Sequence, residues 1–295
     1  MKDRYNISLL LLLLFVATLV GCGGGGGGGE QPTTVQYTLT TQYVDKDGHA
    51  LSNKIVNGVD AFLFVNNLFY QSVSPGTDGK YVVSFDSGDQ ASLVVLGNVS
   101  NDSLHVVTPA VGDNINNVSV KLSPVSRAAV SGAFSPIYLF YGRFDYTSAN
   151  KGSTTLASIS LYNQHARLHV VVNNLQARYG TGNYTLKLEG FRNGITFTGK
   201  VSGDSVVYTP GGSFDGSGNY VSEAVSTLPT MTGEYVTLTV YKDGNQLMQS
   251  GTDSGGNKVT LAAEDDKALV VNASGGGITL QVVPWSAYIQ AHVEY

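Results

Sequence analysis

The sequence predicts an all-β protein, built as two tandem antiparallel β-sandwich domains of the transthyretin-like or immunoglobulin-like kind. Apolar and polar residues alternate with a period of two in many segments after residue 33, which is typical of strands with one buried face. Dipeptides of Asp or Asn followed by Gly separate these segments, and they suit tight hairpin turns. No segment repeats its apolar residues every three to four positions, so no amphipathic helix is predicted.

The alternation is clearest in five segments. The predicted strands cover residues 118–122, 166–172, 185–189, 236–240 and 285–293. In the second of these, His165 and His169 fall opposite the apolar parity, so both are predicted to face solvent. In the last, Trp285 shares one face with the alanines and isoleucine that follow at every second position, which predicts a strand. The predicted turns are Asp47-Gly48, Asp78-Gly79, Asn193-Gly194, Asp215-Gly216 and Asp243-Gly244.

A domain boundary is predicted between residues 126 and 127, dividing residues 35–126 from residues 127–295. Pro124 and Pro136 flank this point, and proline favours linkers or the edges of sheets because it cannot donate a backbone hydrogen bond. The alternative is a long loop within a single sandwich.

The first 21 residues have the pattern of a secretory signal peptide. Lys2 and Arg4 precede an uncharged, leucine-rich stretch that is too short to be a comfortable transmembrane helix. It ends in Leu19-Val20-Gly21-Cys22, which matches the lipobox of bacterial lipoproteins. Cleavage between Gly21 and Cys22 and lipidation of Cys22 are therefore predicted. The alternative is an ordinary signal peptide with an incidental cysteine near the cut.

Residues 22–34 are predicted to be a flexible tether that carries the lipid. Gly23 to Gly29 are seven glycines in a row, a run with no side chains to bury and a high backbone entropy. Two or more acyl chains on one residue anchor a protein stably, whereas a single chain is marginal. No Asp follows Cys22, which favours sorting to the outer membrane.

The composition argues against several classes of protein. The net charge is −5 over 295 residues, and only 13% of residues are charged. A nucleic-acid partner is not expected, because such proteins need a basic patch. Cys22 is the only cysteine, which excludes a disulfide framework and a cysteine-rich zinc site.

No catalytic residue is predicted. Gly203-Asp204-Ser205 resembles part of a hydrolase motif, but it lies between two β segments in mid-chain rather than near the mature N-terminus. Ser148 and Lys151 have the Ser-x-x-Lys spacing of a class of nucleophilic enzymes, without the accessory motifs. Chance explains both patterns better than catalysis does.

No metal site or cofactor is predicted either. His165 and His169 would lie about 13 Å apart on a strand, too far to share one ion. Asp45 and Asp47 resemble the start of a calcium loop, but position twelve of that loop is Val56 instead of Glu. A hairpin turn is favoured there, and a surface calcium site of another type stays open.

The chain has 17 tyrosines, and two roles are open for its aromatic residues. Exposed rings can form sugar-binding platforms, and strand aromatics can fill the core of a sandwich. The core is favoured for Tyr138, Phe140 and Trp285.

Five short segments share a pattern with one known family. Leu93 to Asn98 is similar to a strand end that carries an apolar-Trp-Gly-Asn element, with Leu96 at the position where Trp is common. The matching segments are 59–70, 93–98, 139–142, 167–172 and 282–285. Together with the order of lipobox, tether and two β domains, they resemble the fimbrial anchor and minor-subunit lipoproteins of Bacteroidales, the FimB-type family.

The resemblance implies a structural role at the base of a pilus. Anchor subunits of that family hold the shaft to the outer membrane through their lipid. Shaft subunits are matured by Arg-specific cleavage, which removes an N-terminal strand and opens a groove for a donor strand. Between Cys22 and Arg127 this chain has no Arg, so its first strand is expected to stay joined to the lipid.

The sequence therefore predicts a lipid-anchored, non-enzymatic protein of the cell envelope. It is expected at the outer membrane, facing the cell surface, as the anchor or a minor subunit of a fimbria assembled by strand addition. The expected partners are the membrane, through the lipid, and other fimbrial subunits. The alternative is an outer-membrane surface lipoprotein that binds a ligand or glycan through exposed Tyr residues or Trp285.

Overall fold

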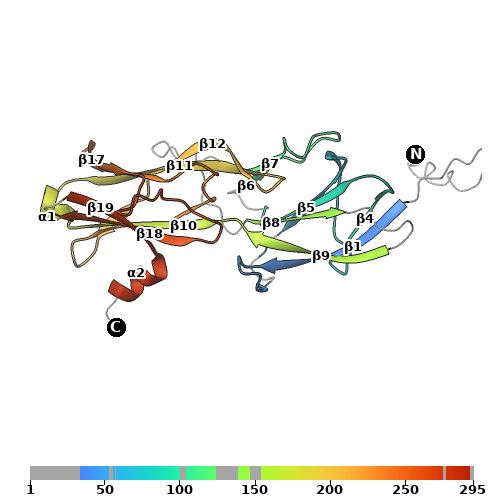
Figure 1. Cartoon of the computed structure of the whole chain (residues 1–295), viewed down its shortest axis with the longest axis horizontal. Coiled ribbons are helices and arrows are strands. Elements are labelled where there is room, and N and C mark those ends of the chain that lie inside the picture. Colours follow the sequence, from blue (N-terminus) through green and yellow to red (C-terminus); the bar gives the residue numbers. More distant parts are fainter. Residues whose placement is uncertain are drawn as a thin grey trace, which may run out of the picture. The chain divides into compact units, whose positions relative to one another are not determined.

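The structure, a computed structural model, describes residues 34–52, 56, 58–99, 104–123, 139–146, 154–274 and 277–292. Most of these residues lie in three β-sheets, accompanied by two short helices (Figure 1). The predicted all-β class is confirmed.

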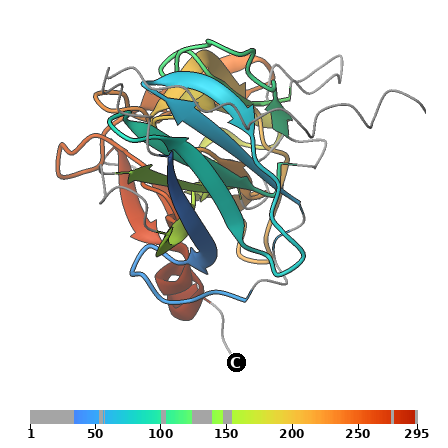
Figure 2. The same cartoon turned by 90° about the vertical axis from the view of Figure 1, so that its right-hand side faces the viewer.

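The first sheet has seven strands in the order β3-β2-β5-β8-β9-β1-β4. Its strands are β1 (Thr34–Val44), β2 (Val59–Val65), β3 (Leu68–Ser72), β4 (Tyr81–Asp86), β5 (Ala91–Gly97), β8 (Phe140–Tyr146) and β9 (Thr154–Asn163). This sheet faces the viewer in Figure 2, where its early strands run in blue to teal.

The second sheet has the order β13-β14-β10-β18-β19, and β15 also pairs with β10. Its strands are β10 (Ala166–Asn173), β13 (Gly212–Phe214), β14 (Tyr220–Ser222), β15 (Val225–Thr227), β18 (Asp266–Ser274) and β19 (Gly277–Pro284). Helix α1 (Leu175–Tyr179) follows β10, and helix α2 (Trp285–His292) follows β19 directly.

The third sheet has the order β17-β16-β11-β7-β6, and β12 also pairs with β11. Its strands are β6 (Leu104–Val106), β7 (Ser119–Leu122), β11 (Tyr184–Thr196), β12 (Val201–Tyr208), β16 (Thr237–Lys242) and β17 (Asn245–Ser250).

The first and second sheets are mixed, whereas the sequence predicts antiparallel pairing throughout; the pairs of the third sheet are all antiparallel. Strand β1 is parallel to β9, and β10 is parallel to β18. Each of these pairs joins segments about a hundred residues apart in the chain, so no tight hairpin imposes an antiparallel direction on them.

Sheet membership does not follow the order of the chain. Strands β6 and β7 join the third sheet beside β11, while the later strands β8 and β9 return to the first sheet beside β5 and β1. The predicted boundary between residues 126 and 127 lies outside the described residues, so the division into domains 35–126 and 127–295 stays a prediction.

The core has two large apolar clusters, and the first sheet contributes side chains to both of them. On β2, Phe62 and Phe64 belong to the cluster that also contains the buried side chains of the second and third sheets. Ala61 and Leu63, which alternate with them, belong to a cluster whose buried residues all come from the first sheet. Both faces of β2 are therefore buried, which explains its nearly continuous apolar sequence.

Most predicted strands and turns are confirmed. The alternating segments at 118–122, 166–172, 185–189 and 236–240 lie in or directly beside β7, β10, β11 and β16. Asp243 and Gly244 join β16 to β17 with φ of 51° and 80°, as a hairpin turn with two left-handed residues requires.

Two sequence predictions about local structure are wrong. Asn193-Gly194 lies inside β11 instead of forming a turn. A Cβ on Gly194 would lie 3.0 Å from the carbonyl oxygen of Val120 on β7, so glycine allows that close approach. Residues 285–292 form helix α2 instead of a strand, because Trp285, Tyr288 and His292 stack along one helical face.

Candidate functional site

Strand β1, the first element of the described chain, lies inside the first sheet. It pairs in parallel with β9 over Gln36–Val44 and antiparallel with β4 over Thr34–Leu39. Val35, Tyr37 and Leu39 are at most 3% exposed. The alternation of its sequence thus produces an internal strand whose inner side chains belong to the core of the first sheet.

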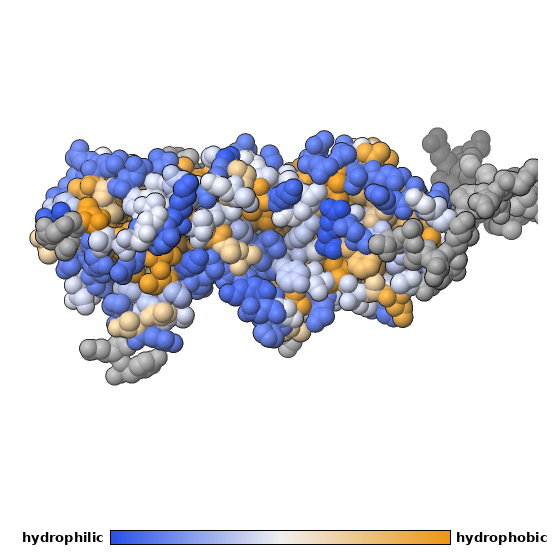
Figure 3. All heavy atoms as spheres, viewed as in Figure 1, coloured by the Kyte–Doolittle hydropathy of each residue, from blue (hydrophilic) through white to orange (hydrophobic). Residues whose placement is uncertain are grey.

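The outer face of β1 and its two neighbours carries one row of residues in which two apolar side chains are exposed. Thr38 on β1 is directly opposite Val82 on β4 and Leu156 on β9. Val82 is 50% exposed and Leu156 is 79% exposed. A shallow hollow of about 400 Å³ lies here, lined by Thr38, Thr40, Lys80 and Leu156 among others. On the face drawn in Figure 3, apolar residues form small, separate patches among hydrophilic ones.

The two ends of the first sheet differ. At one end, β3 is covered along part of its edge by the segment before β7, because Phe69 donates its N–H to Asp113 (2.8 Å) and accepts one from Gly112 (3.0 Å). At the other end, β4 pairs with β1 alone among the described strands. Strand β4 therefore presents the more open edge, a backbone template for a further strand.

Helix α2 packs on the outer face of the second sheet. Tyr288 forms a small apolar cluster with Val171, Ala268 and Val270. Rings of Trp285, Tyr288 and His292 stack along the helix, with centroid distances of 5.3 and 4.2 Å. Figure 1 shows α2 beside β18.

The predicted solvent exposure of the two histidines on β10 is wrong. His165 is 9% exposed and His169 is 6% exposed. His169 stacks on Trp285 and contacts Asp266 Oδ1 through Nε2 at 3.1 Å. Burial lowers the pKa of both histidines from its ordinary value. Helix α2, which the sequence does not predict, covers His169 through Trp285, whereas the ring of His165 contacts the side-chain amide of Asn163.

A hollow of about 300 Å³ opens between α2 and the second sheet. Asn173, Asn272 and Gln281 line its sheet side, and His292 lines its helix side. Asn173 Nδ2 donates a hydrogen bond to Asn272 Oδ1 at 2.7 Å. These residues come from three neighbouring strands and the helix, and no local pattern in the sequence brings them together.

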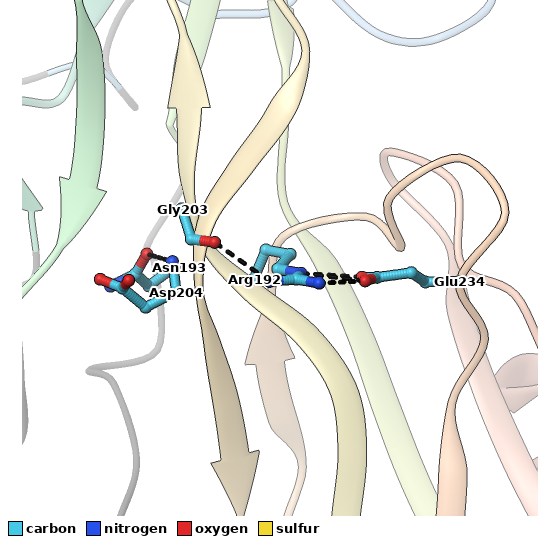
Figure 4. A network of polar contacts seen from close by, with 5 residues as sticks. All are labelled: Arg192, Asn193, Gly203, Asp204 and Glu234. Carbon is cyan, nitrogen blue, oxygen red and sulfur yellow. Dashed lines mark hydrogen bonds and ion pairs between the residues drawn. The ribbon is translucent and has the colours of Figure 1, made fainter.

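A polar network fixes the β11–β12 hairpin. Arg192 makes a bidentate ion pair with Glu234 through Nε and Nη2, and its Nη1 donates to the Gly203 carbonyl at 3.2 Å (Figure 4). Asp204 donates its backbone N–H to Asn193 Oδ1 at 2.8 Å. Gly203-Asp204-Ser205, which resembles part of a hydrolase motif, is thus a stretch of β12 held by structural contacts.

The turn at residues 45–49 brings together Asp45, Asp47 and His49, whose ligand-type atoms lie within 4.8 Å of one another. Asp45 Oδ1 accepts the backbone N–H groups of Asp47 and His49, and Asp45 Oδ2 contacts His49 Nδ1 at 3.1 Å. The backbone N–H bonds to Asp45 lower its pKa. The predicted hairpin turn is confirmed by the bridge between Val44 and Ala50.

The aromatic residues divide between core and surface. Phe140 is fully buried, as predicted, and Trp285 is half-buried against the α2 cluster. Because Trp285 stacks with both His169 and Tyr288, its ring is used within the fold. Tyr70 is 54% exposed, and Tyr138 lies outside the described residues.

The predicted lipidation and cleavage residues, Gly21 and Cys22, lie outside the described residues, as do Ser148 and Lys151. Within the described part of the chain, neither helix has the length and apolar character needed to span a membrane.

The fold is shared with solved structures of low sequence identity. It is similar to the fimbrial anchor protein Mfa2 from Porphyromonas gingivalis, with a TM-score of 0.66 and 14% identity over 85% of this chain and 98% of that one. A candidate polysaccharide-binding protein from Bacteroides thetaiotaomicron gives a TM-score of 0.60 and 14% identity over 85% and 95% of the two chains.

A candidate adhesin from Bacteroides ovatus gives a TM-score of 0.58 and 14% identity over 84% and 92% of the two chains. No curated protein matches the chain. The family model of the fimbrillin-A associated anchor proteins Mfa1 and Mfa2 matches residues 28–291, which is most of the sequence. The chain therefore belongs to the family of fimbrillin-A associated anchor proteins.

Proposed function

We propose that this protein holds a fimbria to the outer membrane through a lipid on Cys22, and that the next subunit joins it by strand addition. Membership of the anchor family and the adhesin-like solved structures support a role as a fimbrial anchor or adhesin in the cell envelope. The lipid, the cell-surface side of the outer membrane and the mode of assembly are the proposed refinements of that role. The proposed role is structural and requires no catalytic residue.

The position of β1 carries the proposal. The strand begins at Thr34, twelve residues after Cys22 in the sequence, and it is paired on both sides. A shaft subunit of this type loses its first strand to Arg-specific cleavage, but no Arg lies between Cys22 and Arg127. The strand nearest the lipid is thus a permanent part of the core, as expected for a subunit that ends the polymer.

The open edge of β4 is the proposed place of strand addition. Its side chains alternate between buried and exposed, so an incoming strand would meet a regular row of backbone groups. Val82, on its outer face, offers an exposed apolar contact beside that edge.

The lipid is tested by Cys22→Ala. We expect the variant to leave the membrane fraction and fimbriae to appear in the culture medium. Gly25→Ala, which keeps the lipobox and changes only the tether, is the control and should stay membrane-bound. Unchanged membrane retention of Cys22→Ala would overturn the lipid anchor.

Strand addition is tested by a charge on each end of the first sheet, because an edge lysine opposes strand pairing. Val82→Lys on β4 should reduce the recovery of anchored fimbriae. Tyr70→Lys on the partly covered β3 is the matched control, since the two side chains are 50% and 54% exposed. Equal recovery of fimbriae from both variants would contradict the proposal that β4 is the docking edge. It would not affect the proposal of a lipid anchor.

A further inference from the structure

The hollow beneath α2 combines polar groups with apolar walls in the way that small-molecule sites do. Helix α2 rests on the second sheet through Tyr288, which packs with Val171 and Val270. The hollow lies beside this contact, bounded by Val270 and Val283 from the sheet and by Ala287 and Ala291 from the helix.

The amide groups in the hollow are only partly used by the protein. Asn173 Nδ2 donates to Asn272 Oδ1, and these side chains make no other hydrogen bond within the described residues. Asn173 Oδ1 is thus left as an acceptor and Asn272 Nδ2 as a donor. Gln281, on the neighbouring strand β19, adds a third amide, which has no hydrogen-bond partner among the described residues.

His292 adds a fourth polar group from the helix. Its Nδ1 lies 2.8 Å from the carbonyl oxygen of Tyr288, which accepts the Nδ1–H. In the neutral ring this tautomer leaves Nε2 as a hydrogen-bond acceptor. Donors and acceptors from the sheet and the helix therefore border one hollow.

The lining also restricts the charge of a ligand. None of the described residues around the hollow is Asp, Glu, Lys or Arg. An ionised ligand would lose its hydration there without meeting a fixed opposite charge, which is costly. Neutral hydroxyl groups lose less, because each can both donate to and accept from an amide.

We propose that this hollow binds one neutral sugar residue of a glycan. Its volume of about 300 Å³ is at the small end of ligand pockets, which suits a single pyranose ring. The amides of Asn173, Asn272 and Gln281 bind the ring hydroxyls, and the side chains of Ala287 and Ala291 contact its C–H face. This activity goes beyond anchoring and does not depend on the lipid.

The test uses the purified full chain with D-glucose, D-galactose, D-mannose and N-acetyl-D-glucosamine in NMR titrations, followed by an array of neutral and acidic glycans. At least one neutral sugar should bind. Asn272→Ala, which removes an amide, and Ala291→Trp, which fills the hollow while keeping every amide, should each weaken that binding tenfold or more.

Gln249→Ala is the matched control, because Gln249 is an exposed glutamine on the end strand β17 of the third sheet. It should leave the affinity unchanged, whereas Gln281→Ala should weaken it. If Asn272→Ala fails to fold, Gln281→Ala and Ala291→Trp still decide the question. Failure of every neutral sugar to bind, a preference for acidic glycans, or binding that survives Ala291→Trp would overturn the proposal.

Discussion

The imidazole of His169 lies parallel to the indole of Trp285, with ring centroids 3.8 Å apart and planes within 5°. His169 belongs to β10 and Trp285 is the first residue of α2, so this stack joins the helix to the second sheet. Its neighbours Tyr288 and His292 extend the row of rings along the helix. The helix is thus held to the sheet by the stack of Trp285 on His169 and by the packing of Tyr288 on aliphatic side chains.

Removing the indole should loosen α2. Trp285→Ala eliminates two stacked pairs, each of which contributes about 0.5–1.5 kcal/mol beyond the area it buries. We expect the free energy of unfolding to fall by about 1–3 kcal/mol and amide hydrogen exchange across residues 285–292 to rise. Ser286→Ala, at an exposed position of the same helix, is the control. Equal exchange in the two variants would contradict this role of the stack.

Acidification should destabilise the same region. Burial lowers the pKa of His169 and of His165 in the folded state, so near pH 6 the unfolded chain binds more protons than the folded one. The free energy of unfolding therefore falls as the pH drops below about 6.5, the ordinary pKa of histidine, and continues to fall toward the folded-state pKa. The urea midpoint measured between pH 7 and 5 should decrease.

His169→Gln should make that pH dependence shallower, because it removes one of the two buried imidazoles. His49→Gln, which changes an exposed histidine, serves as the comparison. A decline in the His169→Gln variant as steep as in the unchanged protein would show that this imidazole does not cause the effect.

Gly142 on β8 should not tolerate a side chain. A Cβ there would lie 2.7 Å from the Ser160 carbonyl oxygen and 2.9 Å from side-chain carbons of Ile159 and Leu161 on β9. Gly142→Ala is expected to lower the free energy of unfolding by about 1–3 kcal/mol, as overpacking does. Gly216→Ala, where a Cβ would meet nothing within 4 Å, should be neutral in the same urea titration.

Strand β1 should behave as core rather than as a removable segment. Leu39 is fully buried, so Leu39→Ala is expected to cost about 2–5 kcal/mol of the free energy of unfolding. Gln42→Ala on the exposed face of the same strand should change it little. A small effect at Leu39, measured by chemical unfolding, would mean that β1 packs loosely.

The regular strands could be predicted because their signal is local. Val236, Leu238 and Val240 face the core as their period of two indicates. Val170, Val171 and Val172 are all buried, and this unbroken apolar run was itself a sign that both faces of β10 are covered. The alternation of the flanking polar residues predicts one solvent-facing side for this strand, and this prediction leaves out the helix that covers it.

Helix α2 and the parallel pairs could not be predicted in the same way. In residues 285–292, alternate apolar residues coexist with the helical spacing of Trp285, Tyr288 and His292, and the contact with His169, more than a hundred residues earlier in the chain, favours the helix. The pairing of β1 with β9 likewise joins segments that are distant in sequence. The hollow beneath α2 depends on the contact of the helix with β10 and on the parallel pairing of β10 with β18. Both contacts join distant segments, so no local sequence motif marks the hollow.

The placement of β1 also has a mechanical consequence. Tension that enters the fold at Thr34 runs along the axis of a strand that is paired with β9 at nine positions and with β4 at six. Such a pull loads these ladders in shear, so many hydrogen bonds share the force at once. A hairpin peeled from its end would instead break them one after another. Strand β1 is therefore suited to bear a tensile load that is applied at Thr34.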